Sequence, residues 1–213
     1  EGLVLFALNQ GEVCTCPSRA LIHELIYDDF MERAIARVNE IKIGHPLETD
    51  TMMGAQASTE QMEKIMSYLE IGKDEGAEVL IGGSANKLEG ELGNGYYVKP
   101  TIFKGHNKMR IFQEEIFGPV IALVKADNIV EAIDVANETK YGLSASIFTE
   151  NIGEILEFIE EMKAGLVRIN AESAGVELQA PFGGMKASST GAREQGEAAK
   201  EFYTEVKTVF IKE

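Results

Sequence analysis

Between residues 120 and 169 the sequence alternates short apolar runs with segments whose apolar residues recur at helical spacing. The runs at 120–124, 144–148 and 166–169 predict strands. The intervening segments predict helices, and Asp127 and Thr149 are candidate N-caps for them. Strands that alternate with helices of this length require a mostly parallel sheet flanked by helices. The predicted fold class is therefore α/β.

The first half of the chain adds elements of the same kind. Residues 20–23 and 77–81 predict strands, and a helix is expected from Tyr27 to about residue 41. A second helix is expected over 58–75, where Ser58 and Gln61 form a capping-box pattern.

The two ends of the chain are read differently. Residues 3–8 are apolar throughout, and periodicity cannot decide between a buried strand and a helix. Residues 204–211 alternate polar and apolar side chains, as an edge strand or half-exposed strand does.

Charge and cysteine content exclude several classes of partner. The formal net charge is −15, which argues against nucleic acid and against an anionic membrane surface. No uninterrupted apolar span long enough for a membrane and no basic leader are visible. The two cysteines, two residues apart, make a poor disulfide framework, so a reducing, cytoplasmic setting is expected.

One of these cysteines is the best candidate for a reactive group. Cys14 follows a glycine-containing turn and precedes a proline, in the run Gln-Gly-Glu-Val-Cys-Thr-Cys-Pro. Small neighbours let a substrate reach the sulfur, and nearby N–H groups can stabilise a thiolate or an oxyanion. Three other readings remain: a small buried hydrophobe, a redox pair with Cys16, and a zinc ligand, for which the scattered histidines supply no spacing.

Two further motifs are ambiguous when taken alone. Gln-Glu-Glu-Ile-Phe-Gly-Pro-Val at 113–120 could be a surface turn that feeds a strand. Pro-Phe-Gly-Gly-Met-Lys at 181–186 reads as a glycine turn after a rigid proline, and it does not match a phosphate-binding loop.

Together the three motifs resemble the signatures of the aldehyde dehydrogenase superfamily, in the expected order and over nearly the whole chain. The resemblance implies that Cys14 is the nucleophile and that Cys16 lies beside it, at the substrate. It implies that Glu115 accepts hydrogen bonds from the nicotinamide-ribose hydroxyls, a sensible role for a carboxylate. Phe117 would contact the nicotinamide end of the cofactor, NAD or NADP.

The same resemblance places substrate residues near the end of the chain. Phe182 would line the substrate funnel, and Asn170 would precede a substrate loop at 171–179. The first half is most similar to bacterial members that act on small aldehydes, whereas residues 188–193 are closer to semialdehyde-type members. The resemblance does not identify the aldehyde.

The implied organisation is a catalytic domain at 1–202, followed by an oligomerisation strand at 203–213 that pairs with a neighbouring subunit. The nucleotide-binding domain, the general-base glutamate and an oxyanion-binding asparagine would precede the nucleophile, outside these 213 residues. The reaction implied is NAD(P)-dependent oxidation of a small aldehyde to an acid through a cysteine thioester. We expect the polypeptide alone to be inactive in that reaction.

Two other functions fit the sequence. The chain could be a non-catalytic module that forms homo-oligomers through its tail. It could also be a thiol redox protein that uses Cys14 and Cys16, although a bridge between residues two apart is strained.

Overall fold

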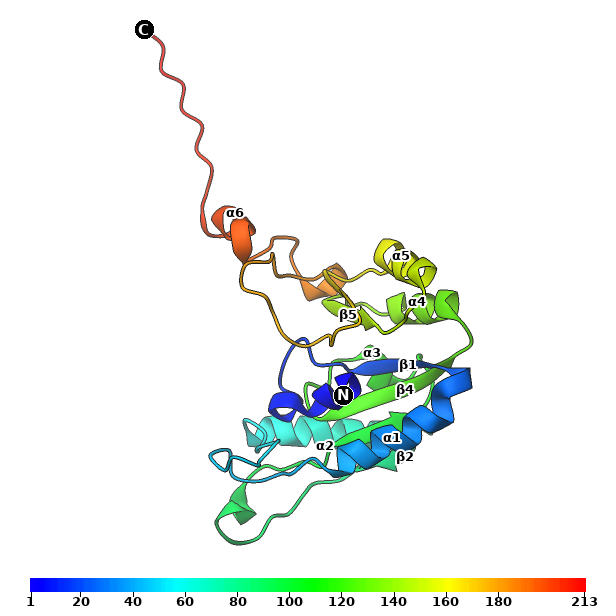
Figure 1. The fold of residues 1–213 in the computed structure, drawn as a ribbon. Helices are drawn as coiled ribbons and strands as arrows, with labels where there is room; N and C mark the ends of the chain where they lie inside the picture. Colours follow the sequence, from blue (N-terminus) through cyan, green and yellow to red (C-terminus); the bar gives the residue numbers. More distant parts are fainter.

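The computed structural model describes residues 1–213 as two α/β layers that lie one beyond the other (Figure 1). The larger layer is a four-stranded sheet with strand order β1-β4-β3-β2. β1 and β3 pair with β4 in parallel, and β2 pairs with β3 antiparallel. The strands are β1 at Arg19–His23, β2 at Glu78–Ile81, β3 at Thr101–Lys104 and β4 at Val120–Ala126.

The smaller layer is a two-stranded parallel sheet, β5 at Ser144–Ile147 and β6 at Leu166–Ile169. Its helices are α4 at Ile129–Asn137 and α5 at Ile152–Glu161. The prediction of a mostly parallel sheet flanked by helices is confirmed, but the strands form two sheets. In Figure 1 the smaller layer lies beyond β1, the edge strand of the larger sheet.

Side chains along β3 and β4 point alternately to the two faces of the larger sheet, and they divide its core into two halves. Ile102, Ile121 and Leu123 join one buried cluster with α1 at Tyr27–Asn39. Their neighbours in sequence point to the opposite face, as successive strand residues must. That second face carries α2 at Thr59–Asp74 and the short helix α3 at Arg110–Gln113, packed on residues that include Phe103, Val120 and Ala122.

The predicted N-caps are right for one helix and one or two residues early for the others. Ser58 accepts a hydrogen bond from the Gln61 N–H and caps α2. The cap of α4 is Asn128, not Asp127, and the cap of α5 is Asn151, not Thr149. In both cases an asparagine stands directly before the first helical residue, and its side-chain oxygen reaches the free N–H groups of the first turn.

The N-terminal apolar run, for which periodicity left strand and helix open, is helical. A 3-10 helix spans Gly2–Gly11 with non-helical angles from Leu8 to Gln10, and Phe6 is buried in the core. Four further 3-10 turns lie at Glu24–Ile26, Gly90–Asn94, Lys186–Ser188 and Gly196–Ala198. No helix has both the length and the apolar character needed to cross a membrane.

The strand predicted at 204–211 is not formed. The chain ends in a short helix, α6 at Ala199–Tyr203, and then runs away from both layers without strand pairing (Figure 1). Phe210 and Ile211 are each 92% exposed. A strand needs an adjacent edge to which its N–H and C=O groups can bond, and this segment lies beside none within the chain.

A polar hub holds the start of β1 against the smaller layer. The Arg19 guanidinium donates to the carbonyls of Val135 and Ala136, at 3.1 and 2.8 Å, and to the side chain of Asn107 at 2.9 Å. Lys186 donates to two further carbonyls there. Cations at the carboxyl end of α4 complement the helix dipole and satisfy carbonyls that have no helical partner.

Candidate active site

Cys14 lies exposed on a tight turn between the N-terminal 3-10 helix and β1. The Cys16 N–H closes the turn by donating to the Val13 carbonyl at 3.0 Å. The Cys14 N–H donates no hydrogen bond within the chain. A thiol with solvent access and a free N–H beside it is the arrangement that a nucleophile and its oxyanion require.

The turn is set by backbone contact with the second motif. Gly11 has a φ of +76°, and a Cβ built on it would lie 2.1 Å from the carbonyl carbon of Gly118. No side chain fits between these two glycines. The Cys14 segment and the Glu-Ile-Phe-Gly-Pro segment, far apart in the sequence, are therefore in direct contact.

Glu12 anchors the same turn from the other side. Its carboxylate accepts from the Ala57 N–H at 3.1 Å and from the Gln10 side chain at 2.8 Å. Gln56 donates to the Gln10 carbonyl at 3.4 Å. The glutamate of the motif thus ties the turn to the segment that leads into α2, a role that sequence reasoning missed because its partners are distant in the chain.

The two cysteines lie in different environments. Cys16 is half-buried, and its thiol donates to the Leu8 carbonyl at 3.6 Å. Burial, and then the nearby Cys14, raise the pKa of Cys16 to about 11. Cys16 therefore stays protonated at neutral pH, and the exposed Cys14 is the accessible thiol.

The second motif presents Glu115 and Phe117 beside this turn. Glu115 is exposed and makes no hydrogen bond within the chain. Phe117 is half-buried and has a φ of +59°, a left-handed conformation that is costly for an aromatic residue. The Gln61 side chain donates to the carbonyls of Phe117 and Ile116, at 2.6 and 3.2 Å, and holds this conformation.

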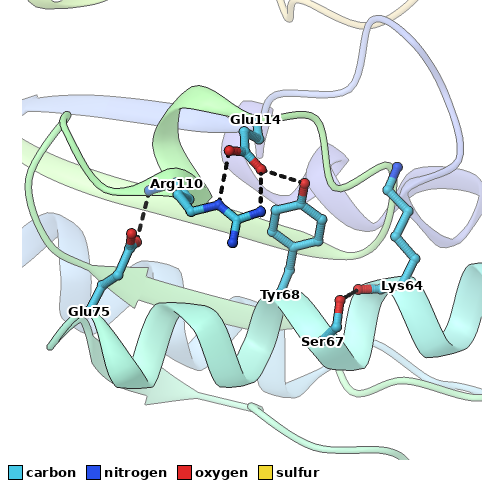
Figure 2. Close-up of polar contacts among 6 residues, drawn as sticks. All are labelled: Lys64, Ser67, Tyr68, Glu75, Arg110 and Glu114. Carbon is cyan, nitrogen blue, oxygen red and sulfur yellow. Dashed lines mark hydrogen bonds and ion pairs between the residues drawn. The ribbon is translucent and has the colours of Figure 1, made fainter.

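The preceding carboxylate, Glu114, is fully engaged (Figure 2). Both of its oxygens accept from the Arg110 guanidinium at 2.9 Å, and one also accepts from the Tyr68 hydroxyl at 2.7 Å. Arg110 and then Tyr68 lower the pKa of Glu114 to about 2. The two adjacent glutamates therefore differ: Glu114 is held by the protein, and Glu115 is free.

The predicted substrate loop contacts the Cys14 turn through a residue that the motifs did not single out. Ser173 is buried, and its hydroxyl donates to the carbonyl of Thr15 at 3.2 Å. Ser144 of β5 in turn donates to the Ser173 carbonyl at 2.9 Å. This chain of contacts joins the smaller layer to the residue that follows Cys14.

Asn170 and Phe182 lie away from this cluster. Asn170 has a φ of +52°, and its amide exchanges two hydrogen bonds with the backbone of Thr149 at the ends of β5 and β6. Phe182 is half-buried, and its carbonyl accepts from the Glu194 N–H. Neither residue lines the groove that contains Cys14. Their substrate role stays a prediction.

A groove of about 1050 Å³ lies between the two layers and brings together the other candidates. Cys14, Glu115, Phe117 and Ser173 all line it. A concave site that combines an apolar wall with a few converging polar groups is typical of small-molecule binding.

The match to known proteins agrees with this geometry. The model of the aldehyde dehydrogenase family matches residues 3–209. This chain belongs to the aldehyde dehydrogenase family. An α-ketoglutaric semialdehyde dehydrogenase of Bacillus subtilis (strain 168) is 59% identical over 206 residues, which cover 96% of this chain and 42% of that protein.

Two solved structures show the same fold. An indole-3-acetaldehyde dehydrogenase of P. syringae, a cysteine-to-alanine mutant in complex with NAD+ and IAA, is 41% identical with a TM-score of 0.90, covering 99% of this chain and 42% of that one. A betaine aldehyde dehydrogenase of Staphylococcus aureus in complex with NAD+ is 37% identical, with a TM-score of 0.90. The match covers 95% of this chain and 40% of that one. The chain thus spans about two fifths of the length of these relatives.

The contact between Gly11 and Gly118 predicts an unusually costly substitution. Gly11→Ala should lower the free energy of unfolding by about 3 kcal/mol, because the methyl group collides with backbone and alanine is strained at this φ. The control is Gly76→Ala, since Gly76 also has a positive φ but has open space around its Cβ position. That variant should lose about 1 kcal/mol in urea denaturation. Equal losses would show that the close contact does not matter.

The Glu114 cluster predicts a stability difference that depends on pH. Because folding lowers the pKa of Glu114 from 4.5 to about 2, its stabilisation is complete above 4.5 and is lost as the pH falls towards 2. Solvent screens this partly exposed cluster, so we expect Glu114→Gln to lose about 1 kcal/mol at neutral pH. Urea titrations of both proteins should converge between pH 4.5 and 2. A difference that persists at the acid end would contradict this assignment.

Proposed function

We propose that this chain carries the catalytic thiol and the nicotinamide-ribose contacts of an NAD(P)-dependent aldehyde dehydrogenase that oxidises a small aldehyde to a carboxylic acid. The observation that carries the proposal is the direct contact of Gly11 with Gly118, which places the exposed Cys14 turn beside Glu115 and Phe117 in one groove. The family membership and the NAD+ bound in two related structures support the same conclusion.

In this mechanism the Cys14 Sγ adds as a thiolate to the aldehyde carbon, and the carbonyl oxygen takes the negative charge. The free Cys14 N–H is one donor for that oxyanion. When the carbonyl re-forms, a hydride leaves the carbon and a thioester to Cys14 results. Water then attacks the thioester, releases the carboxylic acid and restores the thiol.

The residues present fit the nicotinamide end of the cofactor. NAD or NADP, when bound, supplies the acceptor for the hydride. The exposed Glu115 carboxylate, which has no partner in the chain, would accept hydrogen bonds from the ribose hydroxyls. Phe117 presents an aromatic side chain to the same groove.

The tail supports an oligomeric protein. Val206, Phe210 and Ile211 are more than 90% exposed, and the polar-apolar alternation of this segment suits a strand. We propose that it pairs with a neighbouring copy of the chain, so that these apolar side chains leave water. Two unpaired cysteines favour a reducing compartment such as the cytoplasm.

Selective alkylation tests the role of Cys14. Iodoacetamide at neutral pH should label Cys14 and leave Cys16 almost unmodified, because Cys16 is half-buried with a pKa of about 11. Intact mass and peptide mapping give the two rates, and Cys14→Ser should abolish the fast one. Equal labelling of both thiols would favour a redox pair over a nucleophile.

The extent of the chain predicts a second result. The 213-residue polypeptide should label rapidly at Cys14 and yet form no NADH from acetaldehyde, because addition to the sulfur needs only the local backbone. Turnover requires the general base and nucleotide-binding domain that the family resemblance places before the nucleophile. Absorbance assays with the Bacillus subtilis relative, supplied with its own semialdehyde, provide the positive control. Comparable turnover by this polypeptide would contradict the proposal.

A further inference from the structure

Three polar side chains recur at intervals of seven residues along α2 and its C-cap: Gln61, Tyr68 and Glu75. Seven residues make almost two full helical turns, so these side chains share one face of α2 and its end. We call them the polar row. Each member bonds to a different point of the segment 110–117, which holds α3 and the Glu-Ile-Phe motif.

The row follows that segment from its start to its end. The Glu75 carboxylate accepts from the Arg110 N–H at 2.8 Å, at the first residue of α3 (Figure 2). Tyr68 donates to Glu114 at 2.7 Å, one residue after α3 ends. Gln61 donates to the Phe117 carbonyl at 2.6 Å. The contacts thus bracket Glu115 on both sides.

Glu115 makes no hydrogen bond of its own, and Phe117 is bound to Gln61 through its backbone carbonyl. Glu115 is exposed and unpaired, and Phe117 is in a strained left-handed conformation. Strain of this kind persists only where the surroundings over-determine it. Glu114 is bound by both the guanidinium fork and the Tyr68 hydroxyl, and the Arg110 guanidinium lies 5.7 Å from the centre of the Tyr68 ring. The neighbouring Glu115 is therefore kept from replacing Glu114 as the partner of Arg110 and Tyr68.

We propose that the polar row positions the loop at 114–117, with Tyr68 acting through Glu114 to place Glu115 and with Gln61 fixing Phe117. The row makes no contact with a reacting group; its effect is transmitted by the residues that it holds. What Glu115 binds rests on the proposed function, whereas the placement of the loop does not.

The test uses nicotinamide mononucleotide, which contains the nicotinamide and its ribose, titrated into the isotope-labelled 213-residue chain by NMR. Tyr68→Phe, which removes one hydroxyl, should weaken binding about fivefold or more, and Glu115→Gln should do the same. If Tyr68 acts through Glu115, the double variant should bind no more weakly than Glu115→Gln alone. Glu70→Gln, which alters an exposed carboxylate of α2 paired with Lys73, is the matched control and should bind as the wild type does.

Two results would overturn the proposal. One is that Tyr68→Phe binds the mononucleotide as tightly as the wild type; the other is that the double variant's loss of binding free energy equals the sum of the two single losses. Backbone chemical shifts of residues 115–117 separate this failure from that of the proposed function. If the wild type binds no mononucleotide, or Glu115→Gln binds as tightly, the cofactor role of Glu115 fails. The positioning role then stands if Tyr68→Phe and Gln61→Ala shift residues 115–117 away from their wild-type backbone values, and it falls if those values are kept.

Discussion

The backbone contact between Gly11 and Gly118 is the constraint on which the candidate site depends. A left-handed glycine at the end of the N-terminal helix packs against the glycine of the Glu-Ile-Phe-Gly-Pro segment, where even a methyl group would collide. Gly118 is itself covered by Ile65, a fully buried residue of α2. The Cys14 turn is thus placed by packing on the core of the larger layer.

The other contacts extend this arrangement outwards. Glu12 and Gln61 tie the two loops to α2 and to the segment before it, and Ser173 ties the turn to the smaller layer. Ser173 and Thr15, which both line the groove between the layers, are thus joined to each other by a hydrogen bond. Such support is what a site needs to hold reacting groups within a fraction of an ångström.

Local patterns predicted much of the fold. The strand at 166–169 and the helices near 27–39 and 59–74 were recognisable because period and flanking residues agree. Asn128 and Asn151 displaced the predicted caps because several candidate cap residues stand together, and only geometry selects among them. The division into two sheets is a tertiary property, and no local period encodes it.

The site itself was predictable only in part. The family resemblance pointed to Cys14, Glu115 and Phe117; the structure places all three along one groove, and their roles stay predictions. The contacts of Glu12, Gln61, Tyr68 and Ser173 could not be predicted, since each bonds to a partner 45 or more residues away. The tail is the opposite case: its alternation is typical of a strand, but the edge that would pair with it lies outside the single chain.

The most direct test of this account is a paramagnetic relaxation measurement on the isotope-labelled chain. Cys16 is replaced by serine, and a nitroxide is attached to the remaining cysteine, Cys14. If the two motifs and the substrate loop form one site, the amide signals of Glu115, Phe117 and Ser173 should broaden strongly, while those of the tail at 204–213 stay sharp. Sharp signals from Glu115 and Phe117 would show that the Cys14 thiol lies far from these two residues, and would contradict the central claim.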